Sequence, residues 1–383
     1  MKSIRQLGLT IERSCRQRRW VLRLRHCREQ RNAWLRNASA LPSDRSLPNR
    51  CLLDLSNIAI DGEQGRRFHH LVSLLTHGGY SLSMVPRLSF LQTAHRTFKS
   101  TALAQIRPYL GSDSRTRPFD LCLFDKTHPA TEAKQSLYVT ASCSRSLKAQ
   151  ELPLPYGPFP SVWDEDWESN LTHFRNTERN WRLFFGGHCS ESSYAKIRKF
   201  QQFPVLNRFA TIATTKSFFG NDTLLIQNDT SFARAMRISH DGFVLLDNGL
   251  YRTHPKHWLE MIARSDFFLA APGGDYPLSH NVVEAMAVGT VPVIEYGPLM
   301  APPLTDQKNC LTYQGAEGLR RTLAKIRLMD RQQIAALRTG AAKYYDQHLS
   351  ASAFTRALKS GSYRGIHMLH YLAPKADLES AAA

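Results

Sequence analysis

The chain has 383 residues, of which 42% are hydrophobic and 21% charged, and its formal net charge is +18. This length exceeds one ordinary hydrophobic core and predicts two packed α/β domains. No apolar run approaches the roughly 18 residues that a membrane-spanning helix needs, and the N-terminus lacks the apolar core of a secretory signal. The seven cysteines never show C-x-x-C spacing. This favours reduced thiols in a cytoplasmic protein over a disulfide framework or a zinc site.

Residues 1–37 form a strongly basic segment, with eleven Lys or Arg against Glu12 and Glu29, a net charge of +9. Its cations alternate with apolar residues, so we expect it to lie on an anionic membrane surface with Trp20 and Trp34 at the interface. A solvated tail is an alternative. Nucleic-acid phosphates are a third class of partner and are not expected. Residues 1–49 are therefore predicted to be a basic extension and linker.

Residues 50–175 are predicted to form an N-terminal Rossmann-like domain that binds the acceptor. A strand over Cys51–Ile58 is followed by a glycine loop at Asp61–Gly65, a helix over Arg66–His77 and a second strand over Tyr80–Val85. The loop is neither a G-x-G-x-x-G fingerprint nor a phosphate-binding P-loop. It is either an ordinary strand-to-helix turn or part of an acceptor site.

The most informative segment is 265–295, which predicts a complete βαβ unit. A buried strand over Phe267–Ala271 ends in a loop containing Gly273 and Gly274. Ser279 is a good N-cap for a helix over Asn281–Val288, and a final strand covers Val291–Ile294. A glycine loop and a helix N-terminus thus meet at the carboxyl end of a strand. Open α/β sheets bind phosphorylated ligands there.

The run Glu284–Ile294 resembles the donor-binding segment of GT-B glycosyltransferases, and its residue pattern is most similar to that of exostosin-like (family 47-like) chains. Arg179–His188 looks like the first strand and glycine turn of their C-terminal domain, and Asn309–Gly315 resembles a late strand. Asn281 stands where exostosin-like chains have an arginine. Tyr276 stands where retaining enzymes have a second glutamate.

The resemblance implies an α/β, GT-B-like fold of two Rossmann-like domains with a cleft between them. Residues 176–345 would be the nucleotide-sugar domain and residues 346–383 C-terminal helices and a tail. The implied donor site comprises Gly186, Gly187, Gly273, Gly274, Ser279, His280, Asn281 and Glu284. Its positive partner is expected among Lys196, Arg198 and Arg208.

Within this site the resemblance gives Glu284 a contact with the ribose of the donor. We expect its side chain to be half-exposed, so that its replacement by alanine would weaken donor binding roughly 10- to 150-fold without unfolding the chain.

The implied function is transfer of a hexosyl or related group from a nucleotide-sugar to a glycan or lipid-linked acceptor in polysaccharide biosynthesis. The protein is expected in the cytoplasm, peripheral on the inner membrane face. The nucleotide-sugar is a substrate, and neither a cofactor nor a metal is expected.

The D-x-D pattern at Asp164–Asp166 follows a proline-rich run, which favours a solvated acidic loop. Candidate general bases are Asp61, Glu63 and His69, with Asp125 as a further one.

Two other functions fit the same fold. One is a different enzyme, such as a nucleotide-sugar epimerase or a phosphorylase-like protein. The other is a nucleotide-sugar-binding protein without catalysis.

Overall fold

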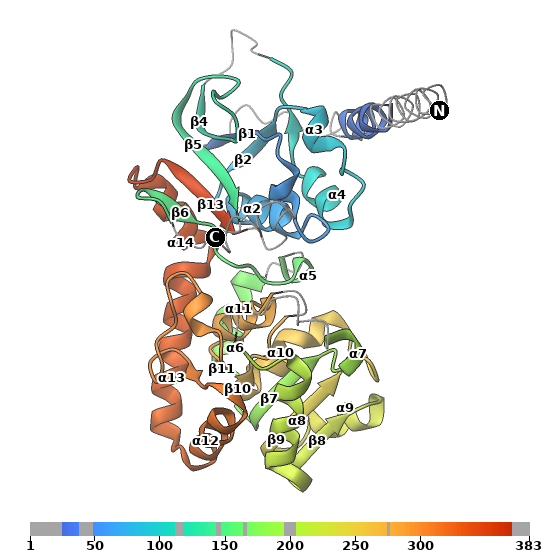
Figure 1. Ribbon diagram of the computed structural model, residues 1–383, viewed down its shortest axis with the longest axis vertical. Coiled ribbons are helices and arrows are strands. Elements are labelled where there is room, and N and C mark those ends of the chain that lie inside the picture. The colour runs from blue at the N-terminus through green and yellow to red at the C-terminus, as the bar shows by residue number, and fades with distance from the viewer. Residues whose placement is uncertain are drawn as a thin grey trace, which may run out of the picture. The chain divides into compact units, whose positions relative to one another are not determined.

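The computed structural model describes residues 25–37, 49–111, 118–142, 147–163, 167–194, 204–273 and 276–369. The chain divides into two compact units (Figure 1). Unit 1 comprises residues 1–154 and 355–383, and unit 2 comprises residues 155–354. Each unit contains one sheet whose paired strands are parallel. Helices follow β1 and β2 in unit 1 and β7 to β11 in unit 2. The predicted fold class of two Rossmann-like α/β domains is confirmed.

The sheet of unit 1 places its first strand, β1, between β2 and β4. β1 and β4 are almost continuously buried, as strands covered on both faces are. In spatial order the strands are β3 (Arg107–Pro108), β2 (Ser81–Met84), β1 (Arg50–Asp54), β4 (Phe119–Phe124), β5 (Ala133–Ser142), β13 (Gly365–Leu369) and β6 (Glu151–Pro153).

The helices of unit 1 include the one predicted over Arg66–His77. They are η1 (Ile58–Asp61), α2 (Arg66–His77), α3 (Leu88–Leu91), α4 (Thr97–Leu103), the greater part of α14 (Ala351–Lys359) and a helix over residues 25–37. α2 starts after Gly65, whose φ of 90° lies in the left-handed region. A Cβ atom there would lie 2.4 Å from the backbone nitrogen of Lys99. Only glycine therefore lets α4 approach the start of α2 this closely.

The helix over residues 25–37 packs on unit 1. Cys27 and Trp34 are buried, and the Trp34 indole Nε1 donates a hydrogen bond of 3.0 Å to the carbonyl of Leu103, the last residue of α4. The predicted membrane-interface position of Trp34 is therefore wrong, because its ring already packs inside the protein. Trp20 and the rest of residues 1–24 lie outside the described residues.

Deleting residues 1–24 is expected to leave the stability of unit 1 unchanged, whereas Trp34→Ala should lower its free energy of unfolding by about 3–5 kcal/mol, as other large buried side chains do on truncation. Thermal unfolding of both variants measures this. Arg36→Ala, on the exposed side of the same helix, is the control. Equal midpoints for Trp34→Ala and Arg36→Ala would show that the helix is not part of the folded unit.

The sheet of unit 2 has β7 at its centre, with β9 on one side and β10 on the other. In spatial order its strands are β12 (Leu311–Thr312), β11 (Val291–Ile294), β10 (Ser265–Leu269), β7 (Trp181–Gly187), β9 (His240–Asp247) and β8 (Thr223–Ile226).

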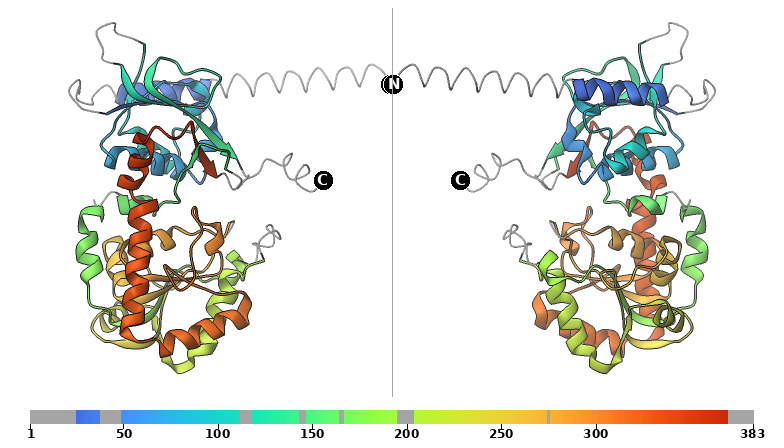
Figure 2. Two further views of the ribbon diagram at one scale, coloured as in Figure 1. Left: turned by 90° about the vertical axis from the view of Figure 1, so that its left-hand side faces the viewer. Right: turned by 90° about the vertical axis from the view of Figure 1, so that its right-hand side faces the viewer.

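The helices of unit 2 lie on both sides of this sheet (Figure 2). They are α5 (Pro160–Trp163), η2 (Trp167–Asn170), α6 (Leu171–Asn176), α7 (Glu191–Tyr194), α8 (Arg208–Phe219), η4 (Gly220–Asp222), α9 (Asp229–Ala235), η5 (Pro255–His257), α10 (Trp258–Ala263), α11 (His280–Ala287), η6 (Gly297–Leu299), α12 (Gly315–Leu328), α13 (Arg331–Tyr344) and η7 (Tyr345–Leu349).

Alternate residues of β7 point into the two helix layers. Leu183 and Phe185 belong to the apolar core that α8 and α12 cover. Phe184 points the other way, and its ring lies 6.0 Å from that of Trp258 at the start of α10. Both faces of the sheet are therefore buried, which explains the uninterrupted apolar character of the strand.

The limits of unit 2 differ from the boundary predicted between residues 175 and 176. The segment from residue 155 onward packs in unit 2, where the Tyr156 hydroxyl donates to the carbonyl of Leu278 and the Arg175 Nε donates to the carbonyl of Ala287. The chain returns to unit 1 within α14, and β13 pairs with β5 and β6. No helix in the described part of the chain is long and apolar enough to cross a membrane.

Candidate active site

The sheet of unit 2 has its topological switch point between β7 and β10. From β7 the chain runs to β8 and β9 on one side and then crosses to β10 and β11 on the other. Carboxyl ends of strands at such a point form a crevice in which α/β proteins bind ligands. Gly186 and Gly187 end β7 here, and α11 follows β10. The predicted βαβ unit is confirmed, with the helix one residue earlier than expected.

A cavity of about 480 Å³ opens at this edge, within the usual size range of small-ligand sites. Every lining residue belongs to unit 2. They are Phe159, Ser161, Val162, Gly186, Gly187, His188, Arg208, Asn248, Arg252, Thr253, Pro255, Trp258, Leu259, His280 and Asn281. Four of the predicted donor-site residues, namely Gly186, Gly187, His280 and Asn281, therefore come together.

The lining of the cavity is cationic. Arg208 and Arg252 give it positive charge, His188 and His280 also line it, and none of the described lining residues is an Asp or Glu. Arg208 is the first residue of α8; its Nε donates to the carbonyl of Pro272 at 2.9 Å and its Nη1 to the Tyr194 hydroxyl at 2.6 Å. Of the three candidate cations, Arg208 is thus the one found at the cavity. Lys196 and Arg198 lie outside the described residues.

Gly186 allows an aromatic wall to form. A Cβ atom at this position would lie 2.5 Å from the Trp258 ring, so a larger residue would displace that ring from the strand. Trp258 therefore lies directly against the end of β7 and forms an apolar side of the cavity.

The described part of the loop between β10 and α11 contributes no residue to the lining of the cavity. The amide of Gly273 donates to the carbonyl of Pro277, and a Cβ atom at Gly273 would lie 2.4 Å from the Tyr276 carbonyl oxygen. Gly273 thus closes the turn and does not line the cavity. Ser279 is the N-cap residue, but its side chain makes no capping hydrogen bond in the described structure. Gly274 lies outside the described residues.

Asn281 presents an acceptor at the cavity. Its side chain is only 7% exposed, and its Nδ2 donates to the carbonyl of Gly186 at 3.2 Å. Its Oδ1 has no hydrogen-bond partner among the described residues. An acceptor that is buried and unpaired is costly, and a ligand hydroxyl or amide in the cavity would satisfy it.

Glu284 lies beneath the cavity and not in its wall. The predicted half-exposed position is wrong: its side chain has no exposed surface. Its Oε1 accepts from the backbone nitrogen of Phe159 at 2.8 Å and lies 3.0 Å from His280 Nδ1, while its Oε2 accepts from Trp258 Nε1 at 2.6 Å. Burial by itself raises the pKa of Glu284, but His280 and these hydrogen bonds outweigh burial and lower it below its ordinary value.

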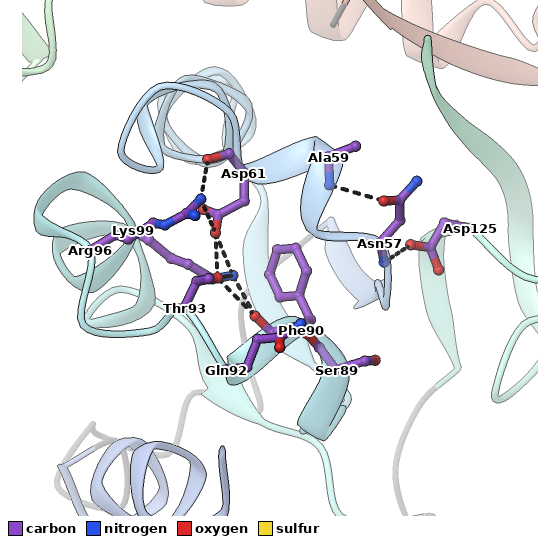
Figure 3. A network of polar contacts seen from close by, with 10 residues as sticks. All are labelled: Asn57, Ala59, Asp61, Ser89, Phe90, Gln92, Thr93, Arg96, Lys99 and Asp125. Carbon is purple, nitrogen blue, oxygen red and sulfur yellow. Dashed lines mark hydrogen bonds and ion pairs between the residues drawn. The ribbon is translucent and has the colours of Figure 1, made fainter. Parts of the chain in front are cut away.

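The candidate bases in unit 1 are held by internal contacts (Figure 3). Asp61 is fully buried; its Oδ2 lies 3.1 Å from Lys99 Nζ, 2.5 Å from Thr93 Oγ1 and 3.4 Å from Arg96 Nη1. His69 is 1% exposed within α2. An acceptor hydroxyl cannot reach either side chain, which contradicts their predicted role as the general base.

The other two acidic candidates are partly exposed and already paired. Glu63 forms ion pairs of 3.0 Å with Arg66 and 3.1 Å with Arg67. Asp125 accepts from the backbone nitrogens of Ser56 and Asn57 and so fixes the loop after β1. Their catalytic role stays a prediction.

Most of the residues that line the cavity were not predicted from the sequence, and Phe159, Arg252 and Trp258 are three of them. Phe159 lies in the proline-rich run before Asp164–Asp166, for which no site residue was predicted. The only sequence signal for Trp258 is indirect, because a glycine pair at the end of a strand indicates that something packs closely there. Nothing in the local pattern distinguishes Arg252 from the chain's other cations.

The described residues contain no group of three or more His, Cys, Asp or Glu side chains that could hold a metal ion. The predicted acidic loop at Asp164–Asp166 lies outside the described residues.

No protein-family model matches the chain, and no curated protein matches its sequence. Several solved structures are similar. A glycosyltransferase from Rickettsia africae aligns with TM-score 0.40 and 9% identity over 82% of this chain and 97% of that one. HepE from Anabaena in complex with UDP aligns with TM-score 0.36 and 12% identity over 82% of this chain and 100% of that one. AviGT4, a glycosyltransferase of avilamycin A biosynthesis, aligns with TM-score 0.41 and 12% identity over 82% of this chain and 97% of that one. Because these TM-scores are below 0.5, the fold and the site are inferred from the chain's own residues.

Proposed function

We propose that this protein is a GT-B-type glycosyltransferase whose unit 2 binds a nucleotide-sugar donor. The observation that carries the proposal is the cationic cavity at the switch point of the unit 2 sheet, beside the N-terminus of α11. The Glu284–Ile294 sequence, which resembles the donor segment of these enzymes, builds α11 and β11 at the same place.

The cavity offers each chemical part of such a donor a suitable partner. Arg208 and the positive end of the α11 dipole suit the diphosphate, which carries the negative charge of the leaving group. Trp258 and Phe159 offer aromatic faces to a base or a sugar ring. The unpaired Oδ1 of Asn281 suits a hydroxyl donor.

In the proposed reaction an acceptor hydroxyl attacks the anomeric carbon as the nucleoside diphosphate leaves. Because protein cations face the diphosphate, we propose that the reaction does not need a metal ion. The exostosin-like subfamily, the hexosyl group, the glycan or lipid-linked acceptor and a cytoplasmic, membrane-peripheral location stay predictions from the sequence.

The second candidate is a nucleotide-sugar-binding protein that transfers no sugar. The burial of Asp61 and His69 favours it, because these two of the four candidate bases predicted from the sequence are inaccessible.

Arg208→Ala is expected to weaken binding of a nucleoside diphosphate about 10- to 150-fold, because a charge-assisted hydrogen bond contributes about 1.5–3 kcal/mol and each 1.4 kcal/mol is a factor of ten. Calorimetric titration with UDP and GDP, with and without EDTA, measures this, and EDTA should leave the affinities unchanged. Arg320→Ala, on the exposed side of α12, is the control.

Absence of binding for every nucleotide would contradict the proposed site. So would equal affinities for the wild type and Arg208→Ala. Loss of binding in EDTA with recovery in Mn²⁺ would contradict metal independence. Nucleotide release that depends on an added glycan acceptor separates a transferase from a binding protein.

A further inference from the structure

The contacts of Glu284 fix the direction of every hydrogen bond around it. A backbone amide and an indole nitrogen can only donate, so both carboxylate oxygens act as acceptors toward Phe159 and Trp258. The lowered pKa of Glu284 is consistent with an ionised carboxylate. An ionised carboxylate has no proton to donate, so the contact with His280 requires the proton to lie on Nδ1 of the imidazole.

This arrangement leaves Nε2 of His280 for a ligand. The His280 side chain is 29% exposed and lines the cavity, and its ring lies 5.2 Å from that of Phe159. Nε2 has no hydrogen-bond partner among the described residues, since Nδ1 makes the ring's only polar contact there. The buried carboxylate thus holds one edge of the ring while the other edge faces the cavity.

The charges around His280 decide which ligand group fits it. Glu284 faces it from its own helix, and Arg208 from α8, His188 from the loop after β7 and Arg252 from the loop after β9 line the same cavity. Glu284 is thus the one anion among these groups, and it lies fully buried. A buried carboxylate favours a cation beside it, and an imidazolium would present Nε2–H to an incoming anion.

We propose that Glu284 is a positioning residue that holds a proton on Nδ1 of His280, and that the doubly protonated ring donates Nε2–H to the diphosphate of the bound nucleotide. The identity of the ligand rests on the proposed function, whereas the pairing of the two residues does not. Glu284 then acts on the donor through His280 and not through a ribose hydroxyl.

The first part of the test needs no ligand. In the ¹⁵N spectrum of histidine-labelled wild-type protein, His280 should carry its proton on Nδ1 or be doubly protonated. Glu284→Asp keeps the charge but withdraws the carboxylate by one methylene, so the neutral ring should lose its preference for Nδ1. A neutral ring protonated only on Nε2 in the wild type would overturn the proposal, as would an unchanged spectrum in Glu284→Asp.

The second part uses UDP and inorganic pyrophosphate as probes. His280→Gln should weaken binding of both about tenfold at acidic pH. In the wild type we expect affinity to decrease toward alkaline pH, and in His280→Gln this decrease should be shallower. The matched control is His257→Gln: His257 pairs with Glu260 at 3.5 Å on the surface of the same unit and does not line the cavity. It should leave affinity and pH profile unchanged.

The two ideas fail in different ways. Unchanged UDP affinity and pH profile in His280→Gln would overturn the role of His280 and leave the nucleotide site standing. Binding of pyrophosphate without binding of UDP would overturn the proposed function and leave the anion contact standing. If neither probe binds, the assignment of His280 to a diphosphate is wrong.

Discussion

Replacing Glu284 with alanine is expected to lower the free energy of unfolding of unit 2 by about 3–5 kcal/mol, the usual effect of removing one partner from a buried charged network. The variant would remove the carboxylate that accepts hydrogen bonds from the indole nitrogen of Trp258 and the backbone nitrogen of Phe159. It would also release the segment that covers α11. From the sequence we expected this variant to bind the donor weakly but to keep its fold. The buried contacts of Glu284 instead predict a large loss of stability.

Urea unfolding followed by tryptophan fluorescence measures the effect of Glu284→Ala. Glu317→Ala is the matched control, because the Glu317 side chain is 69% exposed on α12 and surface substitutions change stability by roughly 0.5 kcal/mol or less. Equal stabilities of the two variants would show that the buried contacts of Glu284 contribute nothing. If Glu284→Ala is less stable, a lower nucleotide affinity in this variant does not by itself show a role of Glu284 in binding. The ¹⁵N spectrum of His280 is then needed to interpret the affinity.

The local pattern of residues 265–295 was sufficient to predict a strand, a loop, a helix and a second strand. Each signal in it is short-range: an apolar run, a cap, a glycine at the helix end. The burial of Glu284 could not be predicted in this way, because the segment that covers it contacts α11 across 125 positions of sequence. A helical periodicity tells which residues share a face but not what packs on that face.

The cations of the site show the same limit. Arg208 was one of three candidates in the second domain, and no sequence pattern distinguishes it from Lys196 and Arg198. What selects it is its place as the first residue of α8, where its guanidinium reaches the carbonyl of Pro272 after β10. That contact depends on the order of strands in the sheet, which the chain's linear pattern does not specify.

In unit 1 the turn at Asp61–Gly65 was predicted correctly as a turn before a helix, with an acceptor site as its alternative. The positive φ of Gly65 and the close approach of Lys99 explain the glycine by packing. The burial of Asp61 has the same origin, because α4 brings Lys99 and Arg96 onto it. The sequence therefore suggested a catalytic role for the Asp61 carboxylate, because the cations that pair with it are distant in sequence and could not be foreseen.

Lys99→Met is expected to destabilise unit 1 by about 3–5 kcal/mol, because it leaves the buried Asp61 carboxylate with the longer contact to Arg96 as its remaining ion pair. The double variant Asp61→Asn with Lys99→Met should recover most of that loss, since it removes both buried charges. Urea unfolding of the two single variants and the double variant measures the coupling. Additive losses in the double variant would show that the two residues do not act as a pair.

The same lysine should make the stability of unit 1 depend on pH in a particular direction. Burial lowers the pKa of Lys99 to about 8, although Asp61 opposes the shift. In the unfolded chain a lysine titrates near pH 10.4, so between about pH 8 and 10.4 the unfolded state binds more protons than the folded state. The contribution of Lys99 to stability therefore rises with pH across this window and is constant below it.

Buried thiols change the stability of unit 1 in the opposite direction, because burial raises the pKa of Cys122 to about 12. The difference between wild type and Lys99→Met cancels those thiols, so plotted against pH it should rise from about pH 8 to 10.4. A flat difference would mean that Lys99 keeps its proton in the folded protein throughout this range.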